Sequence, residues 1–380
     1  MRVVIVCTYY PWPPSVGGVE TIVRNTAVEL AKRGHEVHIV TTPLDVTTGK
    51  PVARSGVEER DGVVVHKLKP SWVKIGYARI IHGLREEIAK IKPDVVHAHN
   101  LHPHLFQLAE WKKELRYKLV AELHHPAIEL DFLIQKLVFP YAVFALRLVN
   151  KRIDSFIAHT EIEKKWLVNK GISECKVHVA RLPGIRPELF STPIKSSRQK
   201  DVIYIGRIVP RKGLHVLIRA VSKVKEYTPN VRVTIAGPTD PKYFKKLVSL
   251  ARRLRLEKAI VFKNYIPEDE KYKLLKEHKV FVLPSLKDYT PNIVLEAQAL
   301  GTPIISTKVG AISEIVLDGE TGILVEPGNV EHLAKAVKIL VSNEKFRKRM
   351  FVKAREFAKN FTLGKVINHI EKIYNQLVSA

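Results

Sequence analysis

Short apolar runs alternate along the chain with longer stretches whose apolar residues recur at helical spacing. At the start, residues 2–7 predict a strand, residues 19–33 a helix and residues 35–41 a second strand, which together form a βαβ unit. The same alternation begins again at residues 201–206 and runs to a final amphipathic helix at residues 363–378. Because parallel strands joined by helices form doubly wound sheets, the sequence predicts an α/β protein with two such sheets.

A polar segment divides the two series of elements. Residues 191–200 (STPIKSSRQK) contain one proline and no periodicity, which is typical of a linker. We therefore expect an N-terminal Rossmann-like domain at residues 1–190 and a C-terminal Rossmann-like domain at residues 201–362. The final helix, residues 363–380, is expected to pack back on the N-terminal domain. With 380 residues, the chain is long enough for each domain to bury its own core.

Three further segments carry specific expectations. Residues 57–68 predict a β-hairpin that turns at an Asp-Gly pair, and residues 75–91 have the spacing of a helix. Residues 131–150 are unusually apolar and aromatic, and Pro140 interrupts them. We interpret them as a core helix broken at this proline. The alternative is a patch that docks on a bilayer surface or receives a lipid-linked acceptor.

The composition is that of a soluble globular protein, with 46% hydrophobic and 27% charged residues. Cys7 and Cys175 lie far apart, which favours reduced thiols and a cytoplasmic location. The first strand is too short for the apolar part of a signal peptide. The longest apolar stretch, residues 137–146, is about half the length needed to cross a bilayer, so we expect no integral membrane segment.

The net charge is +25 and is unevenly distributed. Residues 1–190 contain 28 Lys and Arg against 20 Asp and Glu, whereas residues 191–380 contain 35 against 18. A charge of this size attracts anions, whether a nucleotide-sugar, lipid headgroups or nucleic acid. The basic C-terminal half leads to the hypothesis of peripheral attachment to the inner face of an anionic membrane. A nucleic-acid partner is not expected, because the basic runs lack interleaved aromatic residues.

The stretch at residues 284–301 (PSLKDYTPNIVLEAQALG) carries the most informative motif. It follows a predicted buried strand at residues 279–283 and opens a helix. Thr290 is a good N-cap, Pro291 suits the first helical position, and Gly301 can end the helix. A helix that starts directly after a buried strand is well placed to receive an anion.

The start of this helix offers two kinds of hydrogen-bonding group. The N–H groups of Asn292 and Ile293 can bind an anion with help from the helix dipole. The carboxylates of Asp288 and Glu296 flank them, and carboxylates accept hydrogen bonds from hydroxyls. Amides for a phosphate and carboxylates for hydroxyls suit a nucleotide-sugar.

A second anion-binding pattern begins the C-terminal series. Gly206 and Arg207 directly follow a predicted strand, and Lys212 comes five residues later, before a helix. Arginine can hold a phosphate bidentately, and lysine supplies a point charge. No Asp-x-Asp pair lies near a strand end. We therefore expect fixed cations, and neither a metal ion nor a cofactor, to neutralise a leaving diphosphate.

Histidines follow two predicted strands of the N-terminal half. His97 and His99 end one strand, and His124 and His125 follow another. Strand ends of parallel sheets line ligand crevices, so these side chains are candidates. For His97, His99 and His125 the alternative, a satisfied or surface histidine, is favoured. A metal site is rejected, because spacing fixes no acidic partner for them.

Together these motifs resemble the retaining, GT-B-fold glycosyltransferases of family 4 (glycosyl transferases group 1). The likeness includes the opening Gly-Gly-Val-Glu and Arg-Gly-His-Glu-Val patterns and covers nearly the whole chain. It implies two Rossmann-like domains facing across a cleft. It also implies metal-independent transfer of a sugar, with retention, from a UDP- or GDP-sugar to a hydroxyl acceptor: a glycan, a lipid-linked sugar or a small molecule.

The resemblance implies a role for each candidate residue. Arg207 and Lys212 would bind the diphosphate, Asp288 the sugar hydroxyls and Glu296 the ribose, and His124 would lie beside the donor sugar. The other residues implied in donor binding are Gly17, Gly18, Gly206, Gly237, Ile266, Thr290, Asn292 and Ile293.

Four residues depart from the family pattern. Asp288 replaces the usual Glu, and Pro291 has no N–H to offer the donor sugar. Pro183 and Arg186 replace the usual Asn and Asp of the interdomain turn. Sugar phosphorolysis and nucleotide-sugar epimerisation on the same fold are the alternative activities.

Overall fold

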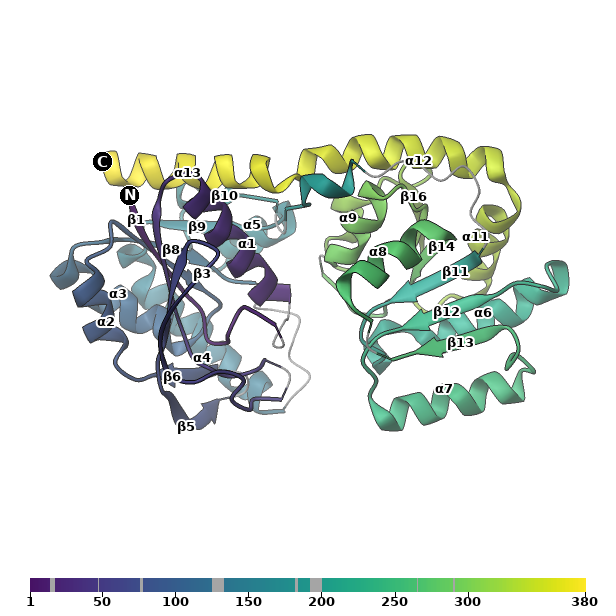
Figure 1. The fold of residues 1–380 in the computed structure, drawn as a ribbon, viewed down its shortest axis with the longest axis horizontal. Coiled ribbons are helices and arrows are strands. Elements are labelled where there is room, and N and C mark those ends of the chain that lie inside the picture. Colours follow the sequence, from purple (N-terminus) through teal and green to yellow (C-terminus); the bar gives the residue numbers. More distant parts are fainter. Residues whose placement is uncertain are drawn as a thin grey trace. The chain divides into compact units, whose positions relative to one another are not determined.

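The structure is a computed structural model that describes residues 1–380 except 14–17, 47, 76–77, 125–132, 182–183, 192–199, 265 and 290. The chain divides into two compact units (Figure 1). The first consists of Met1–Gly184 and Leu363–Ala380, and the second of Ile185–Thr362. Both are α/β and each is built on a parallel sheet, so the predicted fold class is confirmed.

The first unit contains an eight-stranded sheet in the order β10-β9-β8-β7-β1-β2-β4-β3. Its strands are β1 (Arg2–Val6), β2 (Glu36–Thr41), β3 (Gly56–Arg60), β4 (Val63–Lys67), β7 (Val95–His99), β8 (Lys118–Glu122), β9 (Ser155–Ala158) and β10 (Val177–Val179). All pairings are parallel except that of β3 with β4, which is the predicted hairpin. Asp61 and Gly62 turn it with positive φ angles of 53° and 77°.

Helices cover this sheet, and apolar cores lie between helices and sheet. They are α1 (Gly18–Lys32), α2 (Leu84–Ile91), α3 (Pro103–Leu115), α4 (Leu133–Val149), α5 (Glu161–Asn169) and α13 (Leu363–Ser379), with 3-10 turns at Asn150–Arg152 and Glu174–Lys176. The C-terminal helix α13 belongs to this unit although it follows the second unit in the sequence. Most of its neighbours come from the start of the chain. It buries Ile367, Ile370 and Tyr374 in the same core as the inward face of α1.

The helix predicted at residues 75–91 is wrong in its first half. Strand β5 (Pro70–Ile75) pairs antiparallel with β6 (Ala78–Ile81), and of the predicted range only Leu84–Ile91 is helical among the described residues. β-Branched isoleucines favour strands. Gly83, with φ at 78°, then separates the strand from the helix.

The prediction that Pro140 breaks a core helix is also wrong. Helix α4 continues through Pro140, since an interior proline removes one backbone hydrogen bond without having to end a helix. After this proline, Tyr141, Phe144 and Leu148 are 75%, 61% and 66% exposed. An apolar stripe on the described part of α4 therefore faces solvent.

The second unit contains a six-stranded, fully parallel sheet in the order β13-β12-β11-β14-β15-β16. Its strands are β11 (Lys200–Ile205), β12 (Val233–Ala236), β13 (Ile260–Lys263), β14 (His278–Leu283), β15 (Ile304–Thr307) and β16 (Gly322–Val325). Its helices are α6 (Leu214–Tyr227), α7 (Pro241–Arg253), α8 (Glu268–Glu277), α9 (Asn292–Ala299), α10 (Ile312–Ile315), α11 (Val330–Ser342) and α12 (Glu344–Ala358), with 3-10 turns at Pro187–Leu189, Pro210–Lys212 and Lys359–Phe361.

The boundary between the units differs from the predicted position at residue 190. Ile185 and Leu189 are buried in the core of the second unit, so the segment that carries them belongs there. Most of the predicted linker, residues 192–199, lies outside the described residues. The chain passes from the first unit to the second after Gly184 and returns to the first unit between Thr362 and Leu363.

Candidate functional site

The strand order of the second unit reverses direction between β11 and β14. β11 pairs with β12 on one side and with β14 on the other, and both pairings are parallel. In an open parallel sheet, ligands bind beyond the carboxyl ends of the two strands at such a switch point. The two loops that leave this edge are residues 206–213 after β11 and residues 284–291 after β14. They hold the two motifs that the sequence singled out.

Lys212 and Asp288 bring these two loops together. The Lys212 ammonium forms an ion pair with Asp288 Oδ2, and the two side chains are only 12% and 10% exposed. Ser285 Oγ donates to the same oxygen at 2.8 Å, and the N–H of Tyr289 donates to Asp288 Oδ1 at 3.1 Å. Burial lowers the pKa of Lys212 from its ordinary value, and the Asp288 carboxylate partly offsets that shift. A buried cation is thus held at the switch point.

Backbone contacts fix the relative position of the two loops. The carbonyl of Arg211 accepts hydrogen bonds from the N–H groups of Leu286, at 2.8 Å, and Lys287, at 3.2 Å. A Cβ atom on Gly213 would lie 2.0 Å from the carbonyl oxygen of Pro284, and Gly213 has φ at +66°. Only glycine fits this approach. The loops are therefore packed against each other beside Lys212.

The other cation predicted from the sequence, Arg207, lies on the same loop and is exposed. Its carbonyl accepts a hydrogen bond from Tyr204 Oη at 2.7 Å, which ties the loop back to strand β11. The structure thus places Arg207 and Lys212 on one short segment, the first facing solvent and the second largely buried.

Gly206 and Gly237 are packed against each other. The N–H of Gly206 donates to Ala236 O at 3.0 Å, and that of Gly237 donates to Lys263 O at 3.1 Å. A Cβ atom on Gly237 would lie 2.1 Å from Gly206 O. The close packing of adjacent loops, a reason that the sequence did not reveal, therefore requires glycine at residue 237.

Helix α9 begins near the same edge. Its N-cap is Pro291, without a side-chain capping bond, and the predicted N-cap Thr290 lies outside the described residues. Asn292 and Ile293 are its first two residues, whose N–H groups have no partner within a helix. Gly301 follows its last turn with φ at +66°, and a Cβ there would overlap the Phe351 ring. The predicted helix and its end are confirmed, but Pro291 is wrong as the first helical residue, because its backbone is extended and the helix begins at Asn292.

Glu296, on α9, is held in a polar network. Lys271 Nζ lies 2.9 Å from Glu296 Oε1 and 2.8 Å from Oε2. Tyr272 Oη lies 3.4 Å from Oε1 and donates to Glu268 at 2.9 Å. Arg186, one of the departures from the family pattern, donates to Tyr272 Oη at 2.7 Å. Sequence reasoning missed Lys271 and Tyr272, since α8 carries no motif.

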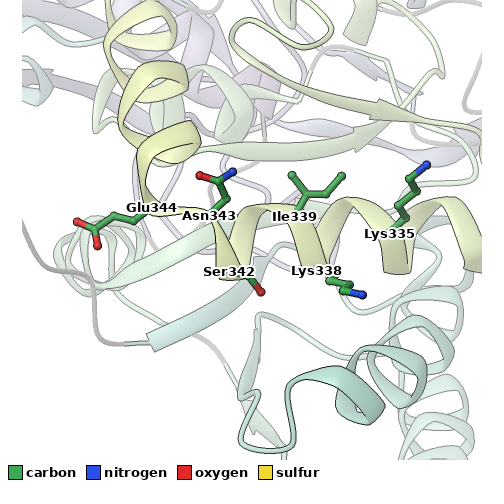
Figure 2. A pocket seen from close by; sticks show the side chains of 6 residues that line it. All are labelled: Lys335, Lys338, Ile339, Ser342, Asn343 and Glu344. Carbon is green, nitrogen blue, oxygen red and sulfur yellow. The ribbon is translucent and has the colours of Figure 1, made fainter.

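The remaining predicted residue of the second unit is Ile266. It is partly buried against the core of the unit, and its neighbour Tyr265 lies outside the described residues. The hollow shown in Figure 2 is elsewhere, along α11 and the start of α12. None of the predicted site residues lines it; its lining side chains are those of Lys335, Lys338, Ile339, Ser342, Asn343 and Glu344.

In the first unit, the carboxyl edge of the sheet carries the predicted histidines. His97 and His99 end β7, and His124 follows β8 with an unusual φ of 28°. His99 Nδ1 and His124 Nε2 are 2.7 Å apart. A positive φ at a residue other than glycine costs energy and is common at functional sites. Gly18 starts α1, whereas Gly17 and His125 lie outside the described residues.

The acidic residue that sequence spacing failed to supply is Glu122. It ends β8, is fully buried and lies within 3.4 Å of a nitrogen of each of His97, His99 and His124. Its position two residues before His124 was a signal, but strand periodicity alone does not show that β7 and β8 are neighbours. The parallel register pairs His99 with Glu122.

Comparison with known proteins agrees with this architecture. The sequence profile of glycosyl transferases group 1 matches residues 186–357, and that of glycosyltransferase family 4 matches residues 16–183. An uncharacterised glycosyltransferase of Methanocaldococcus jannaschii is 26% identical over 389 residues, which cover 94% of this chain and 93% of the relative.

Two solved structures have the same fold. Sucrose-phosphate synthase of Thermosynechococcus elongatus is 19% identical, with a TM-score of 0.78 over 100% of this chain and 99% of the other. HepE of Anabaena in complex with UDP is 19% identical, with a TM-score of 0.77 over 99% and 100%. The fold is therefore that of the GT-B glycosyltransferases. The chain belongs to glycosyltransferase family 4 and is a glycosyltransferase.

No helix among the described residues is both long and apolar enough to cross a membrane.

Proposed function

We propose that this glycosyltransferase moves a sugar from a nucleotide diphosphate-sugar to a hydroxyl acceptor, with retention of configuration and without a metal ion at the diphosphate. The observation that carries the proposal is the Lys212 ammonium, buried against Asp288 at the switch point of the second sheet. Arg207 on the same loop and the N-terminus of α9 supply further positive charge for a diphosphate.

Each residue then has a distinct part. As the sugar leaves, negative charge grows on the diphosphate, and preorganised cations stabilise the transition state more than the ground state. Asp288 keeps Lys212 ionised despite burial and accepts hydrogen bonds from sugar hydroxyls. Glu296 binds ribose hydroxyls in exchange for part of its contact with Lys271. His124, from the first unit, contacts the donor sugar.

Product analysis tests this function. The protein is incubated with a panel of UDP- and GDP-sugars, with and without hydroxyl acceptors, in EDTA and then in excess magnesium. We expect free nucleoside diphosphate only when an acceptor is present, at the same rate in both buffers, and an anomeric coupling constant that matches the donor. Nucleotide release that requires inorganic phosphate would indicate a phosphorylase, and sugar inversion without acceptor would indicate an epimerase.

We also propose that the acceptor is presented at an anionic lipid surface. The exposed side chains of Tyr141, Phe144 and Leu148 recur at helical spacing on α4, and exposed Arg147 lies among them. An apolar stripe with basic neighbours is suited to the interface of an anionic bilayer. Exposed patches of this kind commonly mark contact surfaces.

Cosedimentation with vesicles of phosphatidylglycerol and phosphatidylcholine tests the lipid contact. We expect binding that decreases with salt and is reduced in Phe144→Ser. The matched control is Val352→Ser, because Val352 is 63% exposed on a helix of the other unit. Absence of binding at low and at physiological salt would refute this part of the proposal and leave the transferase activity unaffected.

A further inference from the structure

Five side chains of the first unit form a buried polar cluster, which we call the Glu122 cluster. They come from the carboxyl edge of three adjacent parallel strands, β7, β8 and β9. Three members are fully buried and the other two are less than one tenth exposed. The members are His97, His99, Glu122, His124 and His159.

Ring nitrogens of four histidines surround the Glu122 carboxylate. His124 Nε2 lies 2.7 Å, His159 Nε2 3.2 Å and His99 Nδ1 3.4 Å from Oε1, and His97 Nε2 lies 3.3 Å from Oε2. Among the described residues, neither carboxylate oxygen has a donor with hydrogen-bond alignment. A fully buried carboxylate without aligned donors is costly. A cation that the carboxylate and the imidazoles share would remove that cost.

Two of the histidines have the hydrogen-bonding pattern of metal ligands. His97 Nδ1 lies 2.7 Å from Tyr374 Oη, and His99 Nδ1 lies 2.7 Å from His124 Nε2. In both rings the other nitrogen, Nε2, is buried and has no hydrogen-bond partner among the described residues. A proton on His97 Nδ1 satisfies its contact with Tyr374 and leaves the Nε2 lone pair, 3.3 Å from Glu122 Oε2, for a ligand. In His99 the nitrogen that lies 3.4 Å from Glu122 Oε1 is Nδ1, so His99 would bind the metal through its free Nε2 only after its ring turns. Metal-binding histidines are commonly oriented through their second nitrogen in this way.

One distance, that of His124 to Glu122, favours this triad over the other three-residue combination in the cluster. Neighbouring ligands of a tetrahedral zinc ion are about 3.3 Å apart, because Zn–N and Zn–O bonds are about 2.0–2.1 Å. The 3.3 Å between His97 Nε2 and Glu122 Oε2 matches this value. In the combination of Glu122, His124 and His159, His124 Nε2 is 2.7 Å from Glu122 Oε1, which is too close.

We propose that His97, His99 and Glu122 bind one divalent transition-metal ion of the zinc class inside the first unit. Candidate ligand atoms from the three residues lie within 4.8 Å of one another. Two imidazoles and one carboxylate suit zinc, whereas magnesium prefers oxygen ligands.

The metal ligands differ from the residues proposed to hold the diphosphate. They belong to the first unit, whereas Lys212 and Asp288 belong to the second. His124, which the proposed function assigns to the donor sugar, neighbours the ligands without being one of them. The metal would hold β7 to β8 and, through the contact of His99 with His124, fix the orientation of the His124 ring. The inference therefore concerns the architecture of the first unit, and it does not make the diphosphate chemistry depend on magnesium.

Metal binding is measured directly on the full chain, produced without a histidine tag and dialysed against EDTA. Zinc is titrated in competition with a chromophoric chelator, and cobalt is titrated while visible absorption is recorded. We expect one zinc per chain, a rise in melting temperature with zinc, and cobalt d–d bands without thiolate charge transfer. The last point excludes ligation by Cys7 or Cys175.

Variants assign the ligands. His97→Gln and Glu122→Gln should each remove stoichiometric binding, and Tyr374→Phe should weaken it about 10–100-fold, because the tyrosine supports His97 from outside the metal shell. The matched control is His104→Gln, since His104 is equally buried in this unit but bonds His99 O instead of Glu122. It should retain one zinc.

Two results would overturn the proposal. The first is wild-type protein that binds less than a tenth of an equivalent of zinc at micromolar concentration and shows no thermal shift. The second is full zinc binding that persists in folded His97→Gln and Glu122→Gln. If either variant fails to fold, as judged by circular dichroism, the wild-type titration and cobalt spectrum decide the question. Turnover that is unchanged by adding magnesium tests the proposed function independently.

Discussion

Each unit of this glycosyltransferase buries a carboxylate at the carboxyl edge of its sheet, but the two carboxylates have different partners. In the second unit Asp288 pairs with Lys212, a permanent cation, and also receives hydrogen bonds from Ser285 and Tyr289. In the first unit Glu122 is surrounded by imidazoles, and neither of its oxygens has an aligned donor among the described residues. The same location on two similar sheets thus supports two kinds of chemistry.

The difference lies in which charge each edge is prepared to receive. A fixed ammonium beside a helix N-terminus favours an incoming anion, such as a diphosphate. Imidazole nitrogens around a carboxylate favour an incoming cation. Burial affects both: it lowers the pKa of Lys212 in one unit and the pKa of His99, to about 3, in the other. Substitutions that change one edge should therefore leave the chemistry of the other intact.

The largest effect is expected from Lys212→Ala. Loss of one preorganised charge at a developing anion costs about 2.7–4 kcal/mol, or about 100–1,000-fold in kcat. The donor KM should change less, because the interaction strengthens as the sugar leaves. Steady-state kinetics at saturating acceptor measure both constants. Lys223→Ala is the control, since Lys223 forms an exposed ion pair with Glu331 on the surface of the same unit.

A kcat within threefold of wild type in folded Lys212→Ala would show that the buried ammonium has no part in the chemistry. The proposed difference between the two sheet edges would then be refuted. Zinc binding in the first unit should be unchanged in this variant. A loss of zinc would show that the two edges are not independent.

A smaller effect is expected from Glu296→Ala. A hydrogen bond to a charged group contributes about 1.5–3 kcal/mol, so donor affinity should fall about 10–100-fold while kcat changes little. Isothermal titration with the nucleoside diphosphate measures it. Lys271→Ala serves as a matched variant, since Lys271 is 2.8 Å from Glu296 Oε2 and competes for it. Equal loss of affinity in both variants would argue against direct contact of Glu296 with the nucleotide.

Asp288→Asn tests the burial of the cation itself. The variant keeps the shape of the side chain but removes the charge that compensates Lys212, which is 12% exposed. Leaving a partly buried charge without its counterion should lower the free energy of unfolding of the second unit by about 1–3 kcal/mol. Chemical denaturation followed by circular dichroism measures the loss. Asp288→Glu, which restores the residue usual in the family, should retain most of the stability.

The sequence located the two loops at the switch point of the second unit more completely than the Glu122 cluster of the first unit. Arg207, Lys212 and Asp288 lie in short motifs after apolar strands, and a strand followed by a helix determines where such residues go. Glu122 carries no motif of its own. Its contacts with the histidines depend on the pairing of β8 with β7 and β9. This long-range pairing cannot be read from the spacing of apolar residues within one strand.

The same limit explains the errors in the fold. The spacing at residues 75–91 suited a helix, but hairpin pairing between β5 and β6 prevailed over it. The sequence also could not predict which face of α4 is exposed. Apolar periodicity shows that one face differs from the other, but not which face packs against the protein. Gly237 stays a predicted donor-binding residue, and the structure adds a packing reason for glycine there, because a Cβ atom would lie 2.1 Å from Gly206 O.

The effect that is smallest per step of the measurement concerns the pH dependence of the two units, each of which buries a histidine. Burial lowers the pKa of His104 in the first unit and of His278 in the second to about 4. Between pH 6.5 and about 4 the unfolded chain binds a proton that the folded unit does not. Each histidine therefore contributes stability that is complete above pH 6.5 and falls by about 1.4 kcal/mol per pH unit below it.

His104→Gln keeps a donor for His99 O but does not titrate, so it should flatten the pH dependence of first-unit stability by about that slope. All four tryptophans lie at residues 12, 72, 111 and 166, so urea unfolding followed by their fluorescence at pH 6.5, 5.5 and 4.5 reports on the first unit. His278→Gln is the matched control and should leave that slope unchanged. A slope that changes equally in both variants would mean that the two units unfold as one.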